Sequence, residues 1–163
     1  MKIKRVALIG MLTAVAMIFS FIESQIPPFV AIPAIKLGLP NIVIIFALYK
    51  LGWKEAILIN IVRMLLSSLL FGNLMMLMYS FSGALFSFII MIILKKLNFS
   101  IVTVSILGAI MHNVGQIICA ALVVATVELL YYLPILIITG VISGVIIGLI
   151  GALCVNKLKT FEF

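Results

Sequence analysis

Long apolar segments separated by short polar junctions follow one another along the whole chain. About 20 apolar residues suffice to cross roughly 30 Å of hydrocarbon as a helix. The pattern predicts an all-α integral membrane protein with six transmembrane helices and a single transmembrane domain over residues 1–163. One segment, Asn41–Leu51, is short at 1.5 Å rise per residue, so it either starts earlier or does not fully span. The other predicted spans are Val6–Ile22, Ala56–Phe71, Leu74–Leu94, Phe99–Val127 and Tyr131–Val155.

Basic residues gather at every second junction between these segments. Cytoplasmic loops retain Lys and Arg, whereas translocated loops carry few of them. The alternation therefore predicts an even number of spans with both termini in the cytoplasm. The basic junctions hold Lys2, Lys4 and Arg5, then Lys50 and Lys54, then Lys95 and Lys96, and finally Lys157 and Lys159.

Composition supports a membrane protein independently of this pattern. Hydrophobic residues make up 66% of the chain and charged residues 9%, with a mean hydropathy of +1.48. Soluble domains carry about 25% charged residues. The net charge of +7 is explained by topology and by contact with anionic membrane lipids. No basic stripe with interleaved aromatic residues is present, so we expect no nucleic-acid partner.

The segment after the first predicted span is rich in proline. Pro27, Pro28, Pro33 and Pro40 prevent a continuous helix, because each lacks an amide donor and restricts the residue before it. We therefore expect a long outer loop. Its apolar centre, Phe29–Ile35, predicts that the loop dips back against the bundle as a candidate lid.

Two polar groups inside predicted spans are candidates for solute binding, because ionisable groups at membrane depth are costly. Arg63 lies about 13 Å above the predicted inner boundary, and Asn60 shares its helix face. The alternative is a structural arginine paired with a carboxylate such as Glu55 or with helix-end carbonyls.

His112, Asn113 and Gln116 form a second polar stripe, for which a buried structural histidine is the alternative. No other ligand lies at metal-binding spacing from His112, so we expect no metal site.

Polar residues flanking the proline-rich segment add Glu23, Gln25, Lys36 and Asn41 to these candidates. Each alone is typical of a membrane interface. Together with Arg63 and His112, they would form a cavity with more positive than negative charge, which favours an anionic or phosphorylated small molecule.

Missing residues exclude most enzymatic chemistry. All four acids are glutamates, so an aspartate-rich magnesium site for diphosphate chemistry cannot form. The chain contains neither a Gly-rich nucleotide loop nor a Ser-His-Asp set. We expect a protein that is not an enzyme and has no cofactor. Both cysteines, Cys119 and Cys154, lie in apolar segments and are expected to be small buried hydrophobes.

Small residues recur on two of the predicted helices. Gly140, Gly144 and Gly148, followed by Gly151, let another backbone approach closely, and packing within the bundle is the main expectation. Gly10 and Ala14 form a similar, weaker pair in the first span.

The motifs IKLGLPN (Ile35–Asn41) and HNVGQ (His112–Gln116) resemble the Gx transporter family, whose members are often labelled heptaprenyl diphosphate synthase component I. This resemblance covers nearly the whole chain. The family in turn is similar to the substrate-binding S components of energy-coupling factor transporters, which are six-helix proteins without an ATPase. The resemblance implies a prokaryotic cytoplasmic-membrane protein, a gating outer loop, and docking through Gly10 and Ala14 on a transmembrane coupling subunit that works with ATPases.

We therefore expect a substrate-binding subunit for a small anionic or amphiphilic, vitamin-like metabolite. Arg63, Asn60, His112, Asn113 and Gln116 are the expected contacts, with Glu23, Lys36 and Asn41 contributing from the loop side. The alternative is a non-catalytic membrane accessory subunit of a prenyl, quinone or flavin-linked redox system.

Overall fold

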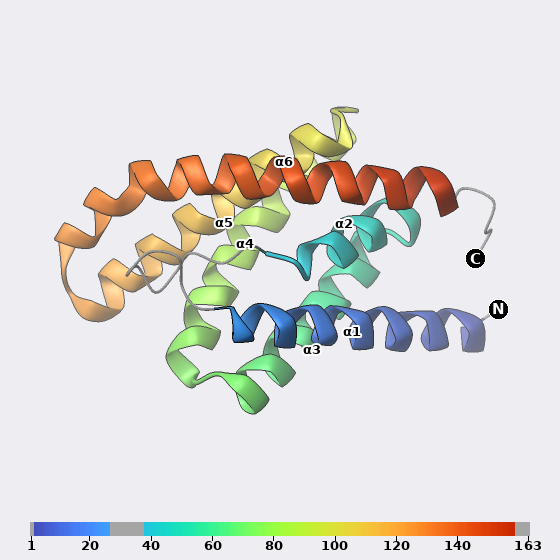
Figure 1. Ribbon diagram of the computed structural model, residues 1–163, viewed down its shortest axis with the longest axis horizontal. Helices are drawn as coiled ribbons and strands as arrows, with labels where there is room; N and C mark the ends of the chain where they lie inside the picture. Colours follow the sequence, from blue (N-terminus) through green and yellow to red (C-terminus); the bar gives the residue numbers. More distant parts are fainter. Residues whose placement is uncertain (1, 27–37, 159–163) are drawn as a thin grey trace.

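The computed structural model describes residues 2–26 and 38–158, and these residues form helices without any strand. They form six α-helices and one short 3-10 helix, and Figure 1 shows how the helices are arranged. The all-α prediction is confirmed, and most helix ends lie within a few residues of the predicted ones. The elements are α1 (Lys2–Gln25), α2 (Asn41–Lys50), α3 (Trp53–Phe71), α4 (Leu74–Lys96), α5 (Ile101–Val124), η1 (Val127–Tyr132) and α6 (Leu133–Lys157).

Local sequence explains where several helices begin and end. The side chain of Asn73 accepts a hydrogen bond from the Met76 amide at 2.8 Å, and this cap starts α4. Ser100 caps α5 in the same way by accepting from the Thr103 amide at 3.1 Å. Between α2 and α3, Gly52 has φ of +121°, a conformation that L side chains rarely adopt. The sharp turn there depends on glycine.

Four stretches among the described residues are long and apolar enough to cross a membrane, which makes this a multi-pass membrane protein. α2 has only ten residues, or about 15 Å of helix, and it starts no earlier than Asn41. α3 has 19 residues but carries Lys54, Glu55 and Arg63. The count of six complete spans stays a prediction. The four stretches are Ile3–Gln25, Leu74–Lys96, Ile101–Val124 and Val127–Lys157.

The short helix α2 lies in the middle of the molecule, between α1 and α6 (Figure 1). Its residues from Ile42 to Leu48 are all buried, and it packs against α1, α3 and α6. A helix that is apolar on every side is stable only where neighbours surround it. The segment that is too short to span is therefore the centre of the hydrophobic core.

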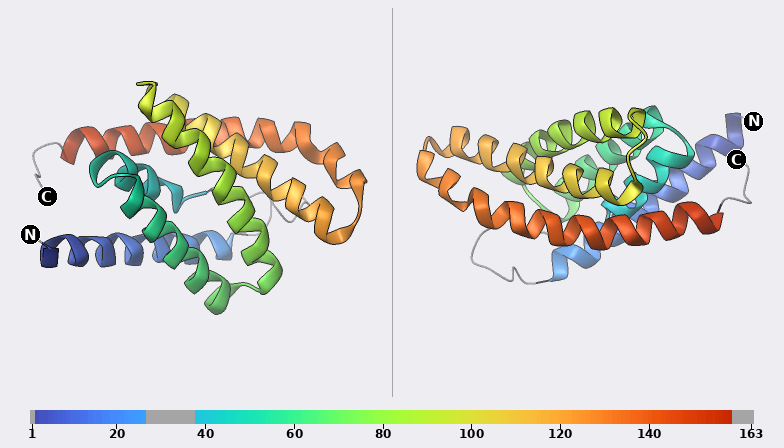
Figure 2. Two further views of the ribbon diagram at one scale, coloured as in Figure 1. Left: turned by 180° about the vertical axis from the view of Figure 1, so that it is seen from behind. Right: turned by 90° about the horizontal axis from the view of Figure 1, so that it is seen from above.

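Glycines bring α4, α5 and α6 into close contact. A methyl group at Gly144 would lie 2.6 Å from the Ile106 Cα atom, and one at Gly148 would lie 2.9 Å from the Val102 Cα atom. The prediction that the glycine stripe of α6 packs inside the bundle is confirmed. α4 and α5 cross in a similar way where Gly83 meets Gly115. Figure 2 shows α4, α5 and α6 packed beside one another.

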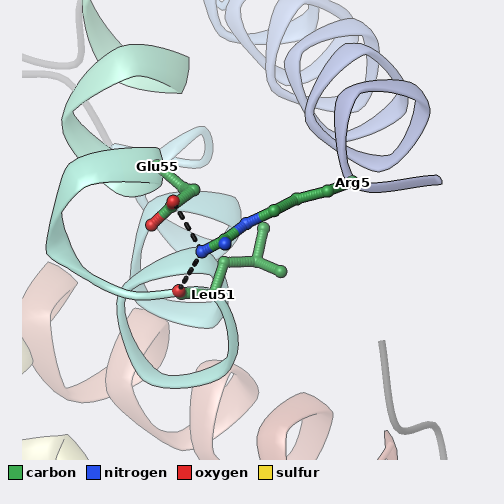
Figure 3. A network of polar contacts seen from close by, with 3 residues as sticks. All are labelled: Arg5, Leu51 and Glu55. Atoms are coloured by element: carbon green, nitrogen blue, oxygen red, sulfur yellow. Dashed lines mark hydrogen bonds and ion pairs between the residues drawn. The ribbon is translucent and has the colours of Figure 1, made fainter. Parts of the chain in front are cut away.

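Basic side chains tie four parts of the chain together at one end of the bundle, where α1 begins and α6 ends (Figure 1). Arg5 donates to the Leu51 carbonyl oxygen at 3.3 Å and to Glu55 Oε1 at 2.6 Å (Figure 3). Two lysines make corresponding contacts, from Lys50 Nζ to Leu158 O at 2.9 Å and from Lys95 Nζ to Leu48 O at 2.5 Å. The four basic junctions thus come together at one end, which we call the basic end. Its cytoplasmic location stays a prediction.

Candidate polar cavity

A small cavity lies between α2, α3, α4, α5 and α6, with a volume of about 20 Å³. That is room for about one water molecule. Apolar residues form much of its lining, as expected in a membrane protein. The polar side chains that line it come from four helices and are Asn41 of α2, Asn60 of α3, Ser87 of α4, and Ser105 and His112 of α5.

Several of these polar side chains have unused hydrogen-bonding capacity. Asn60 and Ser105 are each 4% exposed. Within the described ranges, Asn60 forms its side-chain hydrogen bonds through Oδ1, and the Asn60 amide nitrogen, the Asn41 side-chain amide and the Ser105 hydroxyl take part in none. None of these three is a fully buried atom without a partner, as Tyr49 Oη is. Nearly all buried polar groups in proteins are hydrogen-bonded to protein or to water. The cavity is therefore suited to a polar guest.

Arg63 contacts Asn60 on the side away from the cavity, and the cavity lining does not include Arg63. Its guanidinium donates to Asn60 Oδ1 at 2.7 Å and 3.2 Å, and to Ser20 Oγ of α1 at 3.3 Å. Glu23, one turn further along α1, attracts Arg63 electrostatically. The suggested partner Glu55 is wrong, because Glu55 binds Arg5 at the basic end. Arg63 instead joins α3 to α1 beside the cavity.

Glu23 connects the C-terminal end of α1 to the start of α2. Its carboxylate accepts a hydrogen bond from the Gly38 amide. The Gly38 carbonyl oxygen in turn accepts from the Asn41 amide at 2.8 Å, and Asn41 lines the cavity. Gly38 has φ of +74°, which a side chain would strain. Lys36 and the predicted lid, Phe29–Ile35, lie outside the described residues.

The predicted stripe on α5 divides between two environments. His112 lines the cavity, and the absence of a side chain at Gly83 makes room for its imidazole. Asn113 instead donates to the Leu136 carbonyl oxygen of α6 at 2.7 Å, so it joins two helices. Gln116 is buried against Gly83, away from the cavity lining. The roles of Asn113 and Gln116 as solute contacts stay predictions.

Ser87 and Ser105 are cavity residues that the sequence reasoning missed. Ser105 precedes His112 by seven residues, or about two helical turns, so both lie on one face of α5. That spacing was a usable signal. Ser87 gave no such signal, because its position at the cavity depends on how α4 crosses α5. Its hydroxyl lies 3.4 Å from Met91 Sδ, a weak contact.

Gly10 and Ala14 lie on an exposed face of α1, and no other heavy atom lies within 4 Å of the place where a Gly10 side chain would begin. Docking of a partner there stays a prediction. In residues 2–26 and 38–158, no group of three or more His, Cys, Asp or Glu side chains comes together to hold a metal ion.

The fold and the cavity together define a helical, multi-pass membrane protein with a buried polar site. The sequence model of the heptaprenyl diphosphate synthase component I family matches residues 12–154. The chain belongs to this family. A comparison with curated proteins found no match, and a comparison with solved structures found none either.

Proposed function

We propose that the protein is the membrane-embedded substrate-binding subunit of an uptake system for a small anionic or amphiphilic, vitamin-like metabolite. The observation that carries this proposal is the polar cavity, where the buried side chains of Asn60 and Ser105 have unused hydrogen-bonding capacity. Burying such groups without partners costs free energy, and a bound solute would supply the partners. The site is concave and mostly apolar with a few polar groups, as solute sites in proteins usually are.

The cavity must widen for a metabolite to bind. A volume of about 20 Å³ accommodates about one water molecule, so the helices around it have to separate when a larger solute enters. The contact between Glu23 and Gly38 supports an entry route beside the proline-rich segment, because it joins α1 to the residues just before Asn41. Lys36 and Asn41 would then close the site from the outer side.

The chain would depend on other subunits for energy, since it lacks a nucleotide-binding loop. The exposed pair Gly10 and Ala14 on α1 supports docking on a transmembrane coupling subunit, which would work with ATPases in a prokaryotic cytoplasmic membrane. Small residues on a lipid-facing helix permit close approach of a second helix. In this arrangement the chain binds the solute and is not an enzyme.

Native mass spectrometry of the detergent-purified protein tests the proposal, with extraction and identification of any bound small molecule. We expect a stoichiometric metabolite in the wild-type protein and its loss in His112→Ala, with folding retained. Asn73→Ala is the matched control, because Asn73 caps α4 far from the cavity. Wild-type protein that carries no small molecule under gentle purification contradicts the proposal.

A second candidate function is supported by the family description, which names a component of a heptaprenyl diphosphate synthase. The chain would then be a non-catalytic membrane accessory subunit of a prenyl, quinone or flavin-linked redox system. The same purification separates the two candidates. An accessory subunit copurifies with an enzyme of such a system, and its cavity variants hold that partner as well as the wild type does.

A further inference from the structure

Asn60 is the cavity residue whose orientation the structure fixes most firmly. Its Oδ1 atom accepts two hydrogen bonds from Arg63, at 2.7 Å and 3.2 Å. Arginine is a donor only, so the side-chain oxygen of Asn60 must face Arg63 and its nitrogen must point elsewhere. That nitrogen has no hydrogen-bond partner within the described ranges, although Asn60 is 4% exposed and lines the cavity.

We infer that Arg63 is a positioning residue that holds the Asn60 amide with its two N–H donors available to the cavity, so that the solute bound there presents an acceptor oxygen. This inference rests on the proposed function and adds the chemical class of the recognised group. The nearby Arg63 charge strengthens the amide as a donor. A carboxylate, phosphoryl or carbonyl oxygen fits this donor, whereas an ammonium group does not.

The surroundings of Arg63 agree with a positioning role. Ser20 Oγ accepts a third hydrogen bond from Arg63 and itself donates to the Ala16 carbonyl oxygen at 3.0 Å. With Asn60 on one side and α1 on the other, the guanidinium is held without reaching the cavity lining. A fixed donor of this kind costs the solute less ordering free energy than a mobile arginine side chain would.

Small probes test the polarity of the site directly. Formate is an acceptor, methylammonium is a donor, and both are small enough to enter after modest widening. The melting temperature of the purified protein is measured against each probe, with sodium chloride at equal ionic strength as the reference. We expect a saturable rise with formate and none with methylammonium, because a ligand that binds the folded state stabilises it.

Asn60→Asp is the decisive variant. It keeps the size of the side chain and pairs with Arg63, but it replaces the two donors by an acceptor. We expect a 10-fold or greater weakening of the formate effect, since hydrogen bonds to charged groups contribute about 1.5–3 kcal/mol. Asn73→Asp is the matched control and should respond like the wild type. If Asn60→Asp does not fold, Asn60→Ala serves for the same comparison.

Variants of Arg63 separate positioning from direct contact. Arg63→Gln and Arg63→Lys can still donate to Asn60 Oδ1, so both should retain more of the formate effect than Arg63→Met. In an Asn60→Ala background the three should no longer differ, because groups that act through one another are not additive. If the formate effect in the Asn60→Ala background still depends on whether position 63 is charged, Arg63 acts on the solute directly and the positioning role is overturned.

The inference and the proposed function fail in different ways. A formate response that Asn60→Asp leaves unchanged, or stabilisation by methylammonium, overturns the inference even if a metabolite copurifies with the protein. A wild-type protein without any copurifying metabolite contradicts the proposed function, whatever formate does.

Discussion

The basic end and the polar cavity both gather polar side chains from distant parts of the chain, but they use them differently. At the basic end, Arg5, Lys50 and Lys95 each donate to a backbone oxygen of another segment. In the cavity, Asn60 and Ser105 are buried, and no described residue accepts a hydrogen bond from the Asn60 amide nitrogen or from the Ser105 hydroxyl. Under the proposed function, polar groups that stabilise the fold would thus be separate from polar groups that bind a solute. Functional sites often give up stability in this way.

The largest effect on stability is expected from a substitution that pushes apart α5 and α6, two helices that form the cavity wall. Gly144→Ala places a methyl group 2.6 Å from the Ile106 Cα atom, so we expect a loss of about 1–3 kcal/mol in unfolding free energy. Thermal unfolding in detergent measures it. Gly10→Ala is the control, because nothing lies within 4 Å there, and it should be neutral or stabilising by up to about 1 kcal/mol. Equal losses in both variants would contradict close packing of α5 on α6.

The basic end offers the next largest effect. Lys95→Met removes the hydrogen bond to Leu48 O and the contact of Nζ with the Tyr49 ring, 5.0 Å from its centroid. We expect a destabilisation of about 1–3 kcal/mol, in line with other hydrogen bonds to charged donors. Its neighbour Lys96 is exposed, so Lys96→Met should change the unfolding free energy by less than about 0.5 kcal/mol. A Lys95→Met protein as stable as Lys96→Met would show that the contacts of Lys95 with Leu48 and Tyr49 contribute nothing to stability.

Two serines, Ser82 of α4 and Ser105 of α5, differ in the same way as the basic end and the cavity. Ser82 Oγ donates to the Gly115 carbonyl oxygen at 2.9 Å, whereas the hydroxyl of Ser105, a residue that is 4% exposed, takes part in no side-chain hydrogen bond within the described ranges. With the solute removed from every sample, Ser82→Ala should cost about 0.6–1.5 kcal/mol of stability, and Ser105→Ala should stay within about 0.5 kcal/mol of the wild type. Unfolding curves of the two variants measure the difference. A larger loss of stability in Ser105→Ala than in Ser82→Ala would show that the Ser105 hydroxyl stabilises the fold.

The smallest expected effect concerns the ion pair of Arg5 and Glu55 (Figure 3). The Arg5 side chain is 57% exposed, so solvent screens the pair. A double-mutant cycle with Arg5→Gln and Glu55→Gln should give a coupling of about 0.2–1 kcal/mol that decreases as salt is added. A coupling energy that does not change with salt would contradict this, because it would mean that solvent does not screen the Arg5 side chain.

Much of the fold followed from the sequence, because apolar length and basic junctions respond directly to the membrane. The apolar run from Leu74 to Leu94 predicted α4 within two residues at its C-terminal end. The sequence also showed that Asn41–Leu51 is too short to span. It did not show that this segment is the buried centre, since that depends on how α1, α3 and α6 pack around it.

The cavity was predicted only in part, for a similar reason. Asn60 and His112 stood out because polar groups are rare in apolar segments, and Asn41 stood out because it flanks the proline-rich segment. The structure brings all three to one cavity. Ser87 escaped notice because small polar residues are common in membrane helices. The partner of Arg63 could not be deduced either. Asn60 shares the helix face of Arg63, but Ser20 of α1 meets Arg63 only where α1 packs on α3.

The most direct test measures stability and solute retention on the same samples of Ser82→Ala and Ser105→Ala. Native mass spectrometry reports the retained small molecule, and thermal unfolding of the same preparations reports stability. A polar cavity reserved for a solute predicts that Ser82→Ala is less stable but keeps its solute. Ser105→Ala should lose the solute and be as stable as wild-type protein from which the solute has been removed, because bound solute itself stabilises the folded state. Retention that simply follows stability in both variants would contradict the separation of fold and site.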